Sequence, residues 1–249
     1  MPNSRTVRKR SPVNFSNLEE EREIRYRMLL NEKPSQLTLR GELALLIAVI
    51  INSFSVVLML YSGSGISAIS SVPFAFSEAF PHFTLGTWTY IFQGLLIASL
   101  MQLRKKFVPS YLFSFVVGFV FSQFLDLFEL YINLLPTDFS WRVLYFVISY
   151  VLICIGIALS NRCGLPIIPT DLFPRELAEI IKVAYAKIKI TFDVTCLAIT
   201  AGLTFLLLGY VDGLGIGTVL AAFTMGKGIA FAGKYLDEHF RFVSFMKAE

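Results

Sequence analysis

The sequence predicts an all-α membrane protein with six transmembrane helices. They form two inverted three-helix repeats, each with a Gly/Pro-broken, non-spanning helical insert. Composition, the distribution of basic residues and the matching order of elements in the two halves all favour this fold. Of 249 residues, 55% are hydrophobic and only 16% are charged, and the mean hydropathy is +0.65. A water-soluble domain of this size needs more charge on its surface, so we infer that the bilayer is the solvent.

Six apolar runs are long enough to cross a bilayer, which requires about 20 mostly apolar residues. They are residues 43–61, 87–103, 107–134, 143–160, 190–209 and 215–233. The third run is long enough to tilt or to project from the bilayer. These runs divide the chain into a basic tail, two three-helix halves and a C-terminal tail, at residues 1–40, 41–134, 135–234 and 235–249.

Basic residues predict the orientation of the spans. Lys and Arg cluster in the N-terminal tail, after the second span, between the fourth and fifth spans, and after the sixth. With six spans, all four clusters lie on one side, which is typical of the cytoplasmic face. We therefore expect a multi-pass protein of the cell inner (cytoplasmic) membrane with both termini in the cytoplasm.

The basic tail has two interpretations. It is a solvated arm that sets the topology, or an arm that binds nucleic acid or lipid headgroups. We expect the lipid bilayer, and no nucleic acid, as a partner. Residues 17–32 carry Glu and Arg at helical spacing, which predicts a short surface helix.

Two segments interrupt the series of spans. Residues 63–86 are broken by Pro73 and Pro81, and residues 163–189 contain three prolines before an amphipathic run. Proline prevents a continuous helix, so we expect neither segment to span the membrane. Each insert follows the first span of its half and opens with a glycine-containing turn.

The order span, insert, span, span therefore occurs twice. Gly65 lies 99 positions before Gly164, and a shift of 108 pairs Gly118 with Gly226. Because each half has an odd number of spans, the second half must be inserted upside down. Inverted repeats with interrupted helices are a recurring design of transporters.

The second insert holds the first group of candidate site residues, Pro169, Thr170 and Asp171. Thr170 or Asp171 is expected to cap a helix that begins at Leu172 or Phe173. If this loop enters the membrane, the N–H groups at the helix start bind an anionic group. The alternative is a surface elbow followed by an interfacial amphipathic helix.

Polar side chains inside spans give the second group, because such groups are costly in a bilayer and face protein or water. Lys227 and Asp193 either form a structural ion pair or bind a substrate or coupling ion. Gln93 is a further candidate, and Ser70 and Ser71 are expected to form an uncharged cap in the first insert. Other polar residues in the spans are Asn52, Gln123, Asp126 and Glu129, the last two expected to be exposed to water.

Other site chemistries have little support. The three cysteines form no CxxC pair, the two histidines are far apart in sequence, and no Ser/His/Asp set is present. We therefore expect no catalytic residues, no metal and no cofactor. The glycine-rich run at residues 213–218 precedes a transmembrane helix rather than completing a βαβ unit. Close helix packing and a tight external turn explain it better than a phosphate loop.

Several short motifs in the second half resemble the YczE/YitT-like group of bacterial membrane proteins. The residues that carry the resemblance are Gly156-Ile-Ala-Leu, Cys163-Gly-Leu-Pro, Pro169-Thr-Asp171, Asp193, Gly215-Ile-Gly-Thr218 and Gly226. The resemblance covers about the last third to two-fifths of the chain. It implies a bacterial cytoplasmic-membrane protein and no particular substrate.

Together these features predict a membrane transporter or permease that binds a small polar or anionic solute between its inverted halves. One alternative is a substrate-capturing subunit that requires a separate energising complex. An intramembrane enzyme is the other alternative, and the sequence supports it least because no nucleophile and base are paired. A homodimer is compatible with each of these functions.

Overall fold

The computed structural model describes residues 37–244, which fold into eight helices and two short strands. The long helices are α2 (Gly41–Tyr61), α4 (Leu85–Arg104), α5 (Pro109–Ile132), α6 (Phe139–Ser160), α8 (Tyr185–Leu208) and α9 (Ile216–His239). The short helices are α3 (Ala68–Ala79) and α7 (Pro169–Ile181), and the strands are β1 (Leu37–Arg40) and β2 (Phe240–Val243). The helix predicted at residues 17–32 lies outside the described residues.

All six predicted apolar runs form helices. Among the described residues, α2, α5, α6, α8 and α9 are long and apolar enough to cross a membrane. The second run forms α4, which has 20 residues but a lower apolar content because it contains Gln93 and several hydroxyl side chains. The helical character of the chain is therefore confirmed, with five candidate spans.

Several helices are longer than predicted, most of all α8 and α9. The fifth run was expected to begin at residue 190, but α8 begins at Tyr185 and so includes Lys187 and Lys189. Likewise, α9 continues to His239 and β2 follows directly, within the segment expected to be a tail. In both cases helical hydrogen bonding extends past the end of the apolar run into charged sequence.

The predicted start of α7 is wrong. The helix begins at Pro169, and the Asp171 N–H donates to the Ile168 carbonyl at 3.0 Å, so Thr170 and Asp171 lie in the first turn rather than at a cap. Proline favours the first helical position because its fixed φ suits a helix and its missing N–H leaves no donor there to satisfy.

The first insert differs from prediction in the same way. The helix α3 begins at Ala68, so Ser70 and Ser71 are first-turn residues rather than caps. Pro73 lies inside α3, and Pro174 lies inside α7, each as the sixth residue of its helix. At that position proline removes one hydrogen bond to the carbonyl four residues earlier, and its ring crowds that carbonyl.

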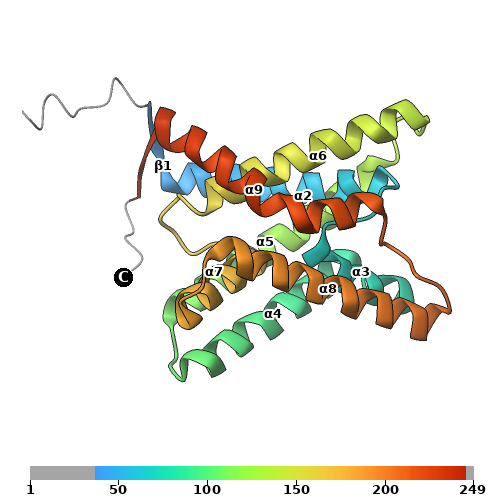
Figure 1. Cartoon of the computed structure of the whole chain (residues 1–249), viewed down its shortest axis with the longest axis horizontal. Coiled ribbons are helices and arrows are strands. Elements are labelled where there is room, and N and C mark those ends of the chain that lie inside the picture. The colour runs from blue at the N-terminus through green and yellow to red at the C-terminus, as the bar shows by residue number, and fades with distance from the viewer. Residues whose placement is uncertain (1–36, 245–249) are drawn as a thin grey trace, which may run out of the picture. The chain divides into compact units, whose positions relative to one another are not determined.

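The helices pack in a regular pattern (Figure 1). The two helices that open the halves, α2 and α6, lie against each other, while α2 also contacts α5 and α6 contacts α9. The short helix α3 packs on α8 and α4, and α7 packs on α4 and α8. Each short helix is therefore enclosed by longer ones.

The segments before α2 and after α9 meet at one end of the structure. Strands β1 and β2 pair in a two-stranded sheet, which the sequence did not predict. At the same end the Arg162 guanidinium binds Asp237 at 2.5 Å. A Cβ on Gly41 would lie only 2.2 Å from the Cys163 carbonyl oxygen. The start of α2 and the ends of α6 and α9 are thus held together.

Two glycine-containing turns interlock before α3 and α9. The Ser64 carbonyl accepts from Gly217 N–H at 3.0 Å, and Ile66 N–H donates to the Gly213 carbonyl at 3.0 Å. Gly65 has a φ of +100°, and a Cβ on it would lie 2.0 Å from Thr218 Oγ1. The interpretation of residues 213–218 as a tight turn with close packing is confirmed.

Candidate functional site

A small cavity lies where the two short helices begin. Its volume is about 30 Å³, and residues from every helix except α4 line it. One water molecule needs roughly 10–15 Å³ by this measure, so there is room for about two. The polar lining residues are Asn52, Ser67, Ser70, Thr170, Asp171 and Lys189.

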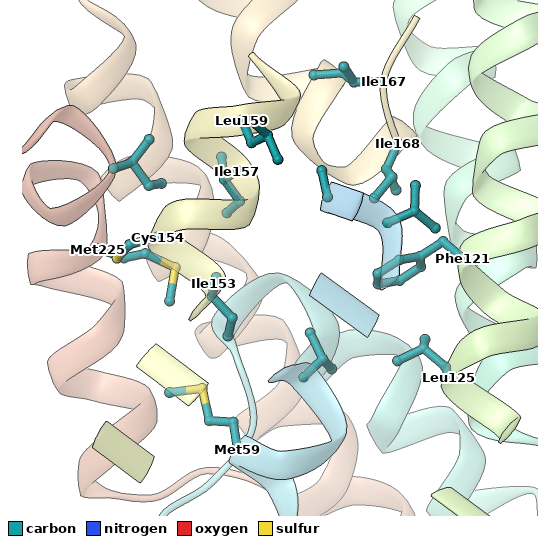
Figure 2. Packing of buried hydrophobic residues seen from close by; sticks show 14 of the residues in the cluster. Met59, Phe121, Leu125, Ile153, Cys154, Ile157, Leu159, Ile167, Ile168 and Met225 are labelled. Carbon is teal, nitrogen blue, oxygen red and sulfur yellow. The ribbon is translucent and has the colours of Figure 1, made fainter. Parts of the chain in front are cut away.

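The apolar part of the lining comes mainly from the helices that surround α3 and α7. Figure 2 shows Phe121 of α5, Ile153 and Ile157 of α6, and Ile168 just before α7, all facing the interior of the bundle. Met225 of α9 also contributes. A polar cavity with such walls has a low local dielectric, which strengthens electrostatic interactions inside it.

Both short helices start at this cavity without a side-chain cap. The first N–H groups of a helix have no acceptor within the helix. Among the described residues, no hydrogen bond is made by the N–H groups of Ala68, Ile69 or Thr170, all of which belong to residues that line the cavity. Buried N–H groups are normally paired, so an acceptor is missing from this place.

Asn52 on α2 provides a second set of unpaired polar atoms. Its side chain is 4% exposed, and neither its amide nitrogen nor its amide oxygen has a hydrogen-bond partner among the described residues. The side chain lines the cavity and lies against Gly156 of α6, where an added Cβ would be 2.0 Å from Asn52 Oδ1. Only glycine at position 156 leaves room for the amide.

A buried ion pair lies beside the cavity. Lys189 Nζ lies 2.6 and 2.7 Å from the two carboxylate oxygens of Asp193, one helical turn along α8. Both side chains are buried, and Lys189 lines the cavity together with Asp171. Lys189 also interacts electrostatically with Asp171. The Lys189 ammonium is therefore bound to Asp193 and acts on Asp171 only through its charge.

Of the two alternatives for Asp193 and Lys227, the structural ion pair between them is not formed. Lys227 is exposed on α9, whereas the ion-pair partner of Asp193 is Lys189. An exposed lysine on a membrane helix can extend along the surface to reach water, so it needs no buried partner. Lys227 is not part of the cavity.

Gln93 is fully buried on α4, and its amide is also unpaired among the described residues. It is not at the cavity, however. A Cβ on Gly118 of α5 would lie 2.0 Å from Gln93 Oε1 and 3.0 Å from Pro169 Cδ. Gln93 and Pro169 therefore pack around Gly118, at the contact of α4, α5 and α7.

The two serines of the first insert have different environments. Ser70 lines the cavity, and its hydroxyl lies 2.8 Å from that of Ser67. Ser71 is turned toward α8, where its hydroxyl lies 2.7 Å from Thr200 Oγ1. Ser71 therefore links α3 to α8.

Side chains of α4 and α5 hold α7 in place through Glu176. Glu176 forms an ion pair with Arg104 at 2.5 Å and accepts a hydrogen bond from the Tyr111 hydroxyl. Arg104 ends α4 and Tyr111 lies in the first turn of α5. This cluster anchors the far part of α7, which keeps the start of the helix at the cavity.

Asp126 was expected to be simply exposed to water, but it has structural partners. Its carboxylate accepts from Gly86 N–H at 2.7 Å and from the Thr84 hydroxyl at 2.8 Å. A carboxylate at these first N–H groups stabilises the start of α4.

Within residues 37–244, no group of three or more His, Cys, Asp or Glu side chains is arranged to hold a metal ion.

Lys189 was not predicted as a site residue, and Asn52 was named only among the polar residues of the spans. Lys189 was counted among the basic residues that set the topology, as if it were solvated. Its spacing of four residues from Asp193, at the edge of an apolar run, is the signal that points to an ion pair. No local signal distinguishes Asn52, because its position depends on where α6 and α7 lie.

The helices and the internal polar cavity define an α-helical, multi-pass membrane protein. A family model described as "Family of unknown function (DUF6198)" matches residues 39–234. The chain belongs to that family. No curated protein and no solved structure matches the chain.

Proposed function

We propose that the protein is a transporter or permease that binds a small polar or anionic solute at the cavity between α3 and α7. The observation that carries the proposal is that two uncapped helix starts and the unpaired Asn52 amide line one cavity. Each helix start has the effect of roughly half a positive charge. Such sites bind the negative end of a solute, and the cavity admits only a small one.

We further propose that the chain is built from two inverted repeats. The helix order long, short, long, long occurs twice, from α2 to α5 and from α6 to α9. Exchanging α2 with α6, α3 with α7, α4 with α8 and α5 with α9 converts the principal helix contacts into one another. Gly65 and Gly164 both have positive φ, and Pro73 and Pro174 take the same place in their helices. In such transporters the site lies between the repeats.

A topology with six spans, including α4, agrees with this arrangement. An even number of spans returns the chain to its starting side, and the pairing of β1 with β2 supports ends on one side. The basic residues then favour termini in the cytoplasm of a bacterial inner membrane. The resemblance to the YczE/YitT-like group stays a prediction that agrees with this placement.

Cysteine labelling tests the topology. In a background without Cys154, Cys163 and Cys196, which are all buried, Glu78→Cys and Lys187→Cys are expected to react with a membrane-impermeant maleimide from opposite sides. Glu78 lies at the end of α3 and Lys187 in the first turn of α8. Measuring both in right-side-out and inverted vesicles provides the internal control, and reaction of both from the same side contradicts the inverted topology.

The function is tested by solute uptake into liposomes that contain the purified protein alone. Chloride and urea serve as an anionic and a neutral probe, and the wild type is expected to move at least one of them faster than empty liposomes. Asn52→Leu, which replaces the amide by an apolar group of similar size, is expected to reduce that uptake at least tenfold. Ser114→Ala, another buried polar side chain without a partner among the described residues but outside the cavity, is expected to keep it.

The other outcomes of the uptake experiment distinguish the proposed function from its alternatives. Binding of a probe without uptake favours the alternative of a substrate-capturing subunit that needs an energising partner. Uptake that Asn52→Leu leaves unchanged, with the variant normally folded, would show that the solute does not pass this cavity. If the protein neither binds nor takes up any probe, the proposed function is contradicted.

A further inference from the structure

The cavity has an excess of negative charge from its own residues. Asp171 is 6% exposed, and its carboxylate interacts with Lys189, Asp193 and Arg175 only through their charges. The Lys189 ammonium is engaged by both oxygens of Asp193. If all three groups are ionised, two negative charges face one positive charge, and the second negative charge has no partner of its own.

Other charged groups near Asp171 do not remove this excess. From α8, Lys189, Asp193 and the Tyr185 hydroxyl interact with it, and Arg175 does so from its own helix. Arg175 lies one helical turn along α7, away from the cavity lining. From α4 and α5, the groups that face α7 are Arg104 and Tyr111, which are engaged by Glu176. The remaining cavity walls, from α2, α3, α5, α6 and α9, are uncharged.

The unpaired groups of the cavity are mainly donors. They are the N–H groups of Ala68, Ile69 and Thr170 and the Asn52 amide nitrogen. Together with the two helix starts, these donors favour an anion. An ionised Asp171 in the same cavity of about 30 Å³ would repel that anion through a medium of low dielectric. Protonation removes the repulsion and also the cost of a buried, unpaired carboxylate.

We propose that the solute is an anion about the size of chloride and that it enters the cavity together with a proton carried by an Asp171 carboxylate oxygen. This inference rests on the proposed function. The proton binds Asp171 on one side of the membrane and is released on the other as the anion leaves, so each cycle moves one proton and one anion. No net charge crosses the membrane. Lys189 and Asp193 remain paired and hold the charge next to the anion constant.

The test uses the full-length protein in liposomes that contain a pH-sensitive dye. An inward chloride gradient, with gluconate replacing chloride inside the liposomes, is expected to acidify the lumen when no other ion can move. Chloride is a suitable probe because its conjugate acid is fully ionised and does not cross the lipid by itself. Chloride uptake without acidification, or acidification that requires a sodium gradient, overturns the proposal. In either case chloride uptake still supports the proposed function, so the two failures are distinguishable.

Asp171→Asn sharpens the test because the amide imitates the protonated carboxyl. With valinomycin and potassium to balance charge, this variant is expected to take up chloride while its chloride-driven acidification falls at least tenfold. Asp138→Asn, an exposed carboxylate at the start of α6, is expected to behave as the wild type. If Asp171→Asn retains the acidification, or loses chloride uptake while its thermal midpoint is unchanged, Asp171 is not the proton carrier.

Discussion

Replacing Lys189 with methionine is expected to destabilise the protein by about 3–5 kcal/mol, the typical cost of removing one partner of a buried ion pair. Methionine has a similar length to lysine, so the main change is the loss of the ammonium group that lies 2.6 and 2.7 Å from the Asp193 oxygens. The Asp193 carboxylate would then be buried without a counter-charge. The measurement is the midpoint of thermal unfolding in detergent, followed by the intensity of the monomeric peak in size-exclusion chromatography.

A second substitution separates the charge effect from packing. Adding Asp193→Leu to Lys189→Met removes both charges, and the double variant is expected to recover most of the lost stability. Lys187→Met, two residues away and exposed, is the matched control and is expected to change stability by less than about 0.5 kcal/mol. A Lys189→Met variant as stable as the wild type would mean that Asp193 is not buried as described.

Gly65→Ala is expected to cost about 3 kcal/mol or more, because strain and overlap add. Gly65 has a φ of +100°, which a residue with a Cβ rarely adopts, and the new Cβ would lie 2.0 Å from Thr218 Oγ1 and 2.5 Å from Gly215 N. The second of these atoms belongs to the backbone and cannot rotate away. We expect the variant to unfold at a clearly lower temperature and to lose the contact between the turns before α3 and α9.

Gly202→Ala is the matched control for this prediction. Gly202 lies within α8, and nothing is found within 4 Å of the position its Cβ would take. Alanine in place of a helical glycine stabilises by roughly 0.5–1 kcal/mol when there is room for it, so this variant is expected to be at least as stable as the wild type. Equal effects of the two substitutions would contradict the described packing of Gly65.

The sequence predicted the long helices well because each depends mainly on local properties. An apolar run of about 20 residues forms a helix in a bilayer whatever its neighbours are, since the backbone must satisfy its own hydrogen bonds there. The starts of α3 and α7 were predicted less accurately. Thr170 and Asp171 are good capping residues by type, but Pro169 is better placed to begin the helix.

The candidate site was predicted only in part. Ser70, Thr170 and Asp171 line the cavity, whereas Gln93, Pro169 and Ser71 serve packing contacts beside it. Asp193 lies next to the cavity through its pairing with Lys189, a residue that was assigned to the topology. These differences arise because residue type and spacing state what a side chain can do, and not which neighbouring helix it will meet.

Composition, apolar runs and proline positions by themselves determined that this is a helical membrane protein with two interrupted segments. The tertiary structure alone decided that the starts of α3 and α7 meet at one cavity and that Asn52 lies there against Gly156. It also decided that Lys227 is exposed and lies outside the cavity. The physical reason is that spans follow from the transfer of each segment into lipid, which is a local quantity. A site follows from the packing of helices far apart in sequence, and that packing depends on shape complementarity along their whole length.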